Sequence, residues 1–163
     1  MVPALILAST RLHSRLRGRW RRGWRGGELP VGYVNLVNLT NANGVFTSDA
    51  YITSPNGVCS LAIKSGTTAL DQSGSRLGSL LIAPSANPPP APGGNIIGLA
   101  YNLGPDGATF NPPITLTITY QSSDIPQGKN EQDIVIAFWN GNNWVNITGP
   151  FTINVTNHTI SAQ

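Results

Sequence analysis

Residues 96–120 read IIGLAYNLGPDGATFNPPITLTITY, which predicts a strand, a tight turn, a Pro-Pro corner and a second strand. In the turn, Pro105 presets the backbone φ, Asp106 can hydrogen-bond its own backbone, and Gly107 accepts a positive φ. From residue 114 to 120 apolar residues alternate with threonines, as in a strand that buries one face. This stretch therefore predicts an antiparallel β fold and identifies no ligand.

From residue 33 onward the chain repeats short apolar segments divided by Gly, Pro and Asn. The strands that we expect besides those above are residues 33–39, 45–53, 58–63, 133–139, 144–148, 151–155 and 158–162. No long stretch keeps a helical period without a Pro or Gly break. We predict an all-β domain over residues 33–163, an antiparallel β-sandwich of about ten short strands.

Three connections carry specific expectations. The Pro55-Asn56-Gly57 turn predicts a hairpin with a primed turn, because Asn-Gly tolerates positive φ. Residues 140–143 (Asn-Gly-Asn-Asn) predict a second hairpin turn. The run Pro88–Pro92 predicts a stiff extended connection, because proline donates no backbone hydrogen bond. An alternative for this run is a proline-rich ligand for an aromatic groove.

The same residues carry a family resemblance. Residues 96–120, followed by EQDIVIAFWNGNNWVNIT at 131–148, resemble the ZU-five domain, a β-sandwich found in ankyrins, netrin receptors and zonula occludens proteins. The closer resemblance is to its prokaryotic, largely archaeal version in large cell-surface proteins. SLAIKSGTTALDQSGSRL (60–77) and LLIAPSANPPPAP (80–92) also fit, so the resemblance spans residues 44–162. Its motif residues are Gly104, Pro105, Asp106, Gly107, Ala108, Phe110, Pro112 and Pro113.

The resemblance implies a non-catalytic structural or protein-interaction module, extracellular or at the cell surface in its parent protein. Its partners would be neighbouring domains or other surface proteins; ankyrin relatives hold spectrin in this way. Some relatives cut their own backbone at a His-Phe-Ser step after the last hairpin. This chain reads NHTISAQ at 157–163 and lacks that step. The resemblance therefore implies a missing last strand and an unpaired edge, and a remnant of a self-processing domain is an alternative.

The first 32 residues differ from the rest. Residues 1–30 hold seven arginines against Glu28, whereas residues 31–163 hold three basic and six acidic residues. The basic charge therefore predicts no nucleic-acid binding by the folded domain. We expect residues 1–32 to be a disordered Arg/Gly/Trp-rich segment. The alternatives are a non-native reading frame, a basic linker, and an arm that binds nucleic acid or an anionic membrane through Trp20 and Trp24.

The apolar run Val2–Ala8 resembles neither a signal peptide nor a membrane span. Its arginines follow the run instead of preceding it, and the run is too short to cross a bilayer. Charged residues are only 10% of the chain. This favours an extracellular surface coated with hydroxyls and amides, the alternative being a fragment of a longer parent whose charges lie elsewhere.

No catalytic, metal or cofactor site is predicted. Cys59 stands in an apolar strand and reads as a small buried hydrophobe. His158 reads as an exposed edge-strand residue, and no second ligand lies at zinc spacing from it. Asp106 reads as a turn former and not as a calcium ligand. The acidic residues Asp124, Glu131 and Asp133 offer a weak cation site as a minor alternative.

Two features suggest contact with sugars. Trp139 and Trp144 flank the 140–143 turn, and an exposed pair would form a platform for glycan stacking; the alternative is that one or both close the end of the core. N-glycosylation sequons begin at Asn38, Asn146, Asn154 and Asn157. They have meaning only in an exported protein.

Overall fold

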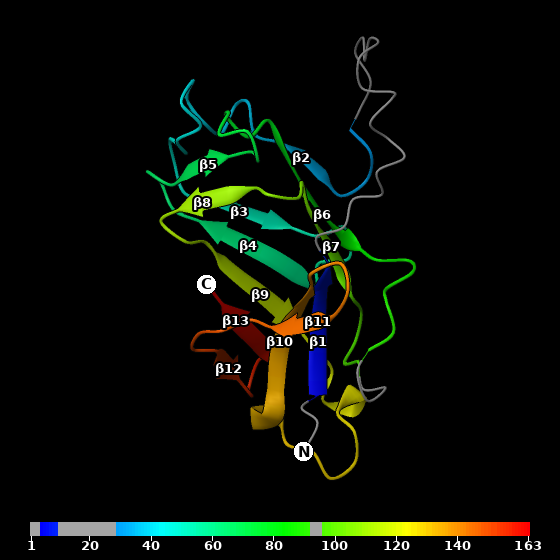
Figure 1. The fold of residues 1–163 in the computed structure, drawn as a ribbon. Coiled ribbons are helices and arrows are strands. Elements are labelled where there is room, and N and C mark those ends of the chain that lie inside the picture. Colours follow the sequence, from blue (N-terminus) through cyan, green and yellow to red (C-terminus); the bar gives the residue numbers. More distant parts are fainter. Residues whose placement is uncertain (1–3, 10–28, 92–95) are drawn as a thin grey trace.

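The computed structural model describes residues 4–9, 29–91 and 96–163. Within this part of the chain the fold is all-β, with thirteen strands in three sheets and two short 3-10 helices (Figure 1). The strands are β1 (Ala4–Ser9), β2 (Tyr33–Asn35), β3 (Ala50–Thr53), β4 (Cys59–Ile63), β5 (Thr68–Leu70), β6 (Ser79–Pro84), β7 (Tyr101–Gly104), β8 (Thr109–Asn111), β9 (Thr115–Thr119), β10 (Ile134–Trp139), β11 (Trp144–Asn146), β12 (Thr152–Asn154) and β13 (Thr159–Ala162). The 3-10 helices are η3 (Ser122–Asp124) and η4 (Glu131–Asp133).

Two of these sheets form the sandwich that the sequence predicts. One has six strands in the order β11-β10-β1-β7-β6-β2, and the other has five in the order β12-β13-β9-β4-β3. The main core contains inward residues of both sheets, among them Ile82 and Ile136 from the first and Leu61 and Ile118 from the second. Burial of apolar faces between the sheets is therefore what holds the two layers together.

A third sheet lies at one end of the sandwich. It pairs β5 with β8 in antiparallel register, with Ala69 opposite Phe110. Ala69 is fully buried and joins the main core, and Phe110 packs against it from a half-buried position. The segment between β7 and β9 therefore extends the core beyond the two main sheets.

The stretch that predicted the fold behaves largely as expected. Strand β9 buries Leu116 and Ile118 and leaves its threonines half-buried, which is the predicted alternation. The turn before it forms at residues 105–107, and Gly107 has φ +76°. The sequence did not predict strand β8, which forms between the turn and the Pro-Pro corner. The first strand begins at Tyr101 and not at residue 96.

Other boundaries also differ from the expectation. Of the predicted strand 33–39 only Tyr33–Asn35 is β2, since Leu36 accepts the turn hydrogen bonds of Leu39 and Thr40. The β3–β4 hairpin forms as predicted, but its turn is not primed. In the described chain His158 is the one non-glycine residue with positive φ, so Asn56 has a negative φ and Gly57 takes the left-handed position at +74°.

The strongest departure concerns the N-terminal segment. Ala4–Ser9, which we expected to be disordered, form β1 and lie parallel to β10 along six residues. Pairing with β10 explains this outcome, because β10 supplies hydrogen-bond partners for the backbone of this segment. The local sequence does not reveal these partners. The other predictions for residues 1–3 and 10–28 lie outside the described residues.

The C-terminal strand is not an edge. β13 pairs with β12 on one side and with β9 on the other.

The nearly continuous apolar sequence of β10 is explained by apolar contacts on both of its faces. Ile134 and Ile136 join the main core, whereas Val135 and Ala137 belong to a second small cluster on the opposite face. β10 is thus a central strand, as its sequence predicts.

Candidate functional site

The motif at residues 104–113 has a structural role in this fold. Gly104 is buried, Pro105 is half-buried, and Asp106 and Gly107 are exposed at the tip of the turn. The backbone N–H of Ala108 donates to the carbonyl of Pro105 at 3.3 Å. Pro112 and Pro113 are exposed at the corner before β9. The motif residues therefore set the path from β7 through β8 to β9.

The turn at residues 105–107 packs closely against the loop at residues 71–76. A Cβ atom added at Gly107 would lie only 2.8 Å from the Cβ of Gln72, so the two backbones approach closely. The carboxylate of Asp71 holds this loop by accepting hydrogen bonds from Ser73 and from the backbone N–H of Ser75. The side-chain hydrogen bond from Ser73 is the main reason why the pKa of Asp71 is lowered.

Arg76, at the end of the 71–76 loop, holds a second loop at residues 37–40 in place. Its Nη2 donates to the carbonyl oxygens of Val37 at 2.6 Å and Thr40 at 2.9 Å, and its Nε donates to Thr40 Oγ1 at 3.0 Å. Thr40 Oγ1 in turn donates to the carbonyl of Leu36. The guanidinium thus joins two loops that lie far apart in sequence, and the fork geometry of Arg suits this role.

The tryptophan pair is brought together as predicted, but not as a platform. Trp139 and Trp144 are opposite each other in the β10–β11 ladder, with ring centroids 5.5 Å apart and planes at 62°. Both are half-buried. An edge-to-face pair does not present two coplanar ring faces to a sugar. This geometry agrees better with the structural alternative than with glycan stacking.

Trp144 also holds the proline-rich connection. Its Nε1 donates to the carbonyl of Pro90 at 3.1 Å. Its ring packs on a small apolar cluster of Ala100 and Ala137, to which Ala91 and Ile96 also contribute. The amide oxygen of Asn140 is used within its own turn, where it accepts from the backbone N–H groups of residues 142 and 143. The indole N–H of Trp144 and the amide oxygen of Asn140 therefore both have partners within the chain.

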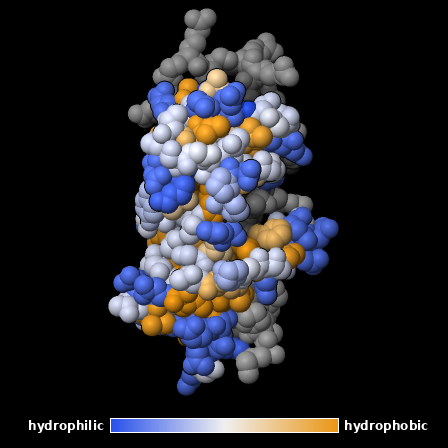
Figure 2. All heavy atoms as spheres, turned by 90° about the vertical axis from the view of Figure 1, so that its left-hand side faces the viewer, coloured by the Kyte–Doolittle hydropathy of each residue, from blue (hydrophilic) through white to orange (hydrophobic). Residues whose placement is uncertain are grey.

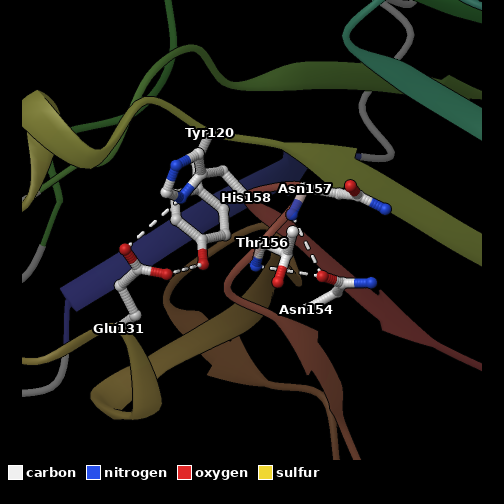
Figure 3. A network of polar contacts seen from close by, with 6 residues as sticks. All are labelled: Tyr120, Glu131, Asn154, Thr156, Asn157 and His158. Atoms are coloured by element: carbon white, nitrogen blue, oxygen red, sulfur yellow. Dashed lines mark hydrogen bonds and ion pairs between the residues drawn. The ribbon is translucent and has the colours of Figure 1, made fainter.

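A polar cluster that the sequence did not suggest lies at the end of β9 (Figure 3). The hydroxyl of Tyr120 donates to Glu131 Oε2 at 2.7 Å, and His158 Nδ1 lies 3.3 Å from Glu131 Oε1. This second contact has the distance of an ion pair without hydrogen-bond geometry. The rings of Tyr120 and His158 meet edge to face at 5.7 Å. Burial, and then the bond to Glu131, raises the pKa of Tyr120.

This cluster corrects two expectations. His158 is half-buried in the turn before β13, with φ 49°, and is not an exposed residue of an edge strand. Of the three acidic residues named as a weak cation site, Glu131 faces Tyr120 and His158, and Asp133 Oδ2 accepts the backbone N–H of Asn130. In the part of the chain that is described, no group of three or more His, Cys, Asp or Glu is placed to hold a metal ion.

The sequons are all on the surface. Asn38, Asn146, Asn154 and Asn157 are exposed. The side-chain oxygen of Asn154 caps the turn after β12 by accepting from the backbone N–H groups of Thr156 and Asn157, both at 3.0 Å (Figure 3). In the first sequon the hydroxyl of Thr40 is buried and bound. The three C-terminal asparagines lie on or next to β11 and β12, the outer strands of the two main sheets.

The thiol of Cys59 is inaccessible, as predicted. The residue is fully buried in the core, and desolvation raises its pKa to about 12. Within the described residues, no helix is long and apolar enough to cross a bilayer. No known protein family, curated protein or solved structure matches the chain, and its function is therefore inferred from the contacts above.

Proposed function

We propose that the chain is a non-catalytic structural or protein-interaction module of a prokaryotic cell-surface protein, of the ZU-five type. It presents loops and strand edges of a two-sheet sandwich to neighbouring domains or other surface proteins. The observation that carries this proposal is the character of the outer strands of the two main sheets.

These four outer strands are β2, β11, β3 and β12. Their sequences, YVN, WVN, AYIT and TIN, contain neither a charged residue nor a proline. Natural proteins usually protect free strand edges with such residues or by keeping the edge strand very short, because an uncovered edge pairs with other chains. These four strands have three or four residues and lack the protecting residue types, so they suit a short strand-to-strand contact with a partner.

Exposed apolar side chains accompany each of these edges. Tyr51 on β3 is 71% exposed, Val145 on β11 is 36% exposed, and Val155, which follows β12, is 48% exposed. Val31 and Val37 flank β2 and are also exposed. On the face in Figure 2, apolar atoms reach the surface in several patches, one of them at the height of β12 and β13 in Figure 1. Each edge thus offers backbone hydrogen-bonding groups next to an exposed apolar side chain.

Several of the described charged residues have partners within the chain. Arg76 and Asp71 hold loops, and the exposed pair Lys64–Asp49 joins the ends of β4 and β3 at 2.7 Å. Glu131 binds Tyr120. Their charged groups therefore hold loops and strand ends in place.

Site-specific photocrosslinking tests the proposal. A benzophenone amino acid is placed at Tyr51, Val145 or Val155 in the full chain, and at exposed Ser73 in the 71–76 loop as the matched control. Each variant is incubated with the cell-envelope fraction of the cells that produce the protein, and crosslinked proteins are identified by mass spectrometry. We expect one protein partner to be captured from edge positions and not from Ser73.

A lysine at the same edge position supplies the second readout. If Val145 crosslinks a partner, an unlabelled Val145→Lys chain should no longer compete for that partner at β11. Where Val155 or Tyr51 captures the same partner, Val145→Lys should also reduce the capture from these positions. Equal capture from Ser73 and from the edges, or no capture from any edge, would contradict the proposed role.

A further inference from the structure

The proline-rich connection after β6 has a backbone shape that its residue types determine. Residues 88–92 read Pro-Pro-Pro-Ala-Pro. Each proline fixes its own φ, and a residue that precedes a proline favours an extended ψ. Residues 88–91 accordingly run without a turn or bend. These features are typical of the polyproline II helix, which has roughly three residues per turn and no internal hydrogen bonds. The prolines of the run therefore present carbonyl acceptors and no N–H donor.

One side of this segment lies against the protein and the other faces solvent. Pro88, Pro89 and Ala91 are half-buried, whereas Pro90 is exposed. A helix with roughly three residues per turn directs one residue per turn away from the surface that it lies on, and the observed burial agrees with this. Ala91 packs on the small cluster of Ala100 and Ala137. The segment is therefore seated on the chain as an extended peptide ligand would be.

The surface under the segment belongs to the outer face of the six-stranded sheet. Ile136 of β10 points into the main core, so Val135, Ala137 and Trp139, which alternate with it, lie on the opposite face. Trp144 of β11 is opposite Trp139, and the two rings meet edge to face at 5.5 Å. Val135 and Trp144 both pack on the small cluster. An aromatic pair and small apolar residues therefore form one surface.

The hydrogen bond between this surface and the segment joins groups of complementary type. Trp144 Nε1 donates to the carbonyl of Pro90 at 3.1 Å. An indole N–H is a donor only, and the backbone of a proline offers an acceptor only. Aromatic-lined surfaces bind proline-rich segments because the polyproline II helix is preformed and loses little entropy on binding. The contact between residues 90 and 144 therefore has the features of polyproline recognition.

We propose that the surface formed by Trp139, Trp144 and the Ala100–Ala137 cluster is a polyproline-binding site, and that residues 88–91 of the same chain are its resident ligand. The covalent connection gives this ligand an effective concentration on the order of millimolar, so it keeps the site closed to free proline-rich peptides. The site lies on a sheet face and does not depend on the role proposed for the four outer strands.

Binding of the free segment to an opened chain tests the proposal. The opened chain carries Pro88→Gly, Pro89→Ser and Pro90→Gly, which replace a stiff run by a flexible one of the same length. The probe is a fluorescent peptide with the sequence of residues 85–92, SANPPPAP. Fluorescence anisotropy measures its binding to the opened chain and to the wild type. We expect the opened chain to bind the peptide at least about tenfold more tightly, because the wild-type site is already occupied.

Two controls separate polyproline recognition from general apolar contact. A peptide that carries the same three substitutions should bind the opened chain at least about tenfold more weakly, because it is not preformed as a polyproline II helix. In the opened chain, Trp144→Phe removes the indole N–H that donates to Pro90, whereas the matched variant Trp139→Phe keeps it. Trp144→Phe should therefore weaken binding of the proline peptide more than Trp139→Phe does.

Three results of the binding experiment overturn the proposal. The first is equal affinity of the wild type and the opened chain for the proline peptide. The second is an absence of binding by an opened chain that circular dichroism shows to be folded. The third is equal binding of the two peptides, or equal weakening by the two tryptophan substitutions, because the surface would then not select polyproline through Trp144.

The wild type provides a measurement that needs no opened chain. In NMR spectra the indole N–H of Trp144 should exchange with deuterated solvent at least about tenfold more slowly than in the urea-unfolded chain, because it is bonded to Pro90. Exchange at the rate of the unfolded chain would mean that the segment does not occupy the site. Failure of either experiment leaves the outer-edge proposal to its own crosslinking test, which uses different positions.

Discussion

At the scale of single residues, Arg76 joins two loops through three side-chain hydrogen bonds. Its three hydrogen bonds end on the backbone and hydroxyl of the turn at residues 37–40. Nothing in the local sequence around Arg76 indicates this role, because its partners lie more than thirty residues away. The contact is the kind that a planar guanidinium makes and an ammonium does not.

We predict that Arg76→Ala lowers the free energy of unfolding by about 2 kcal/mol, because charge-assisted hydrogen bonds to the 37–40 turn are lost. Arg76→Lys should recover less than half of this loss, since a lysine keeps the charge without the fork. Urea unfolding followed by circular dichroism measures both. A change in Arg76→Ala below about 0.5 kcal/mol would mean that the turn is held by its own backbone hydrogen bonds.

Cys59 gives a prediction for alkaline pH. Burial raises the pKa of its thiol to about 12, whereas the unfolded thiol ionises at an ordinary value. Between about pH 9 and 12 the unfolded state therefore binds fewer protons, and stability falls as pH rises, by at most about 1.4 kcal/mol per unit for this one group. We expect Cys59→Ala to have a shallower fall than the wild type in this range. Denaturant titrations at several pH values measure the difference.

Tyrosines with raised pKa values, such as Tyr120, also contribute to the fall. The comparison with Cys59→Ala separates the thiol from them, because the tyrosines are common to both proteins. Identical slopes would show that the thiol ionises alike in the folded and unfolded states. An independent measure is reaction with a disulfide reagent at pH 8, which should be slow in the folded protein and complete in denaturant.

At the scale of elements, the turn between β7 and β8 depends on its close approach to the 71–76 loop. Gly107 and Gly74 both have a positive φ, +76° and +78°. They differ in their surroundings, because an added Cβ meets Gln72 at 2.8 Å at residue 107 and nothing within 4 Å at residue 74. The two positions therefore separate backbone strain from a steric clash.

We predict that Gly74→Ala costs about 1 kcal/mol of stability from the left-handed backbone alone. Gly107→Ala should cost at least about 1 kcal/mol more, because a backbone or the Gln72 side chain has to move. Thermal and urea unfolding of the two variants measure this difference. Gln72→Gly should relieve part of the cost in the double variant. Equal losses at both positions would show that the loops separate freely.

At the scale of the whole molecule, the two main sheets are joined by a polar contact as well as by the core. Asn56, in the β3–β4 turn, donates through Nδ2 to the hydroxyl of Tyr101 on β7 at 2.9 Å. Tyr101 is fully buried and belongs to the main core. The contact links the five-stranded sheet to the six-stranded sheet at β7.

We predict a coupling of about 1 kcal/mol between Asn56→Ala and Tyr101→Phe in a double-mutant cycle. The cycle is needed because the side chain of Asn56 also accepts a hydrogen bond from Ser54 at 2.7 Å, which the single variant loses too. Unfolding free energies of the wild type, both single variants and the double variant give the coupling. A value near zero would mean that apolar burial alone joins the sheets at this point.

The fold class follows from patterns that are local in sequence. The alternation in residues 114–120 predicted β9, and the continuous apolar run at 134–139 predicted that β10 is central. Both patterns reflect which faces of one strand are buried, and a period of two residues records that directly. The turns at Pro105–Gly107 and Asn140–Asn143 were found because their residue types determine the backbone angles.

Tertiary structure decided the features that join distant segments. The position of β1 between β7 and β10, and of β13 between β12 and β9, depends on backbone partners elsewhere in the chain. The contacts of Glu131 with Tyr120 and His158, and of Trp144 with Pro90, come from separate loops and strands. The sequence alone determined the type of elements such as β9, β10 and their turns, because backbone preferences and burial period act over a few residues. Only the folded chain determined which elements and side chains meet, because that depends on the packing of the whole sandwich.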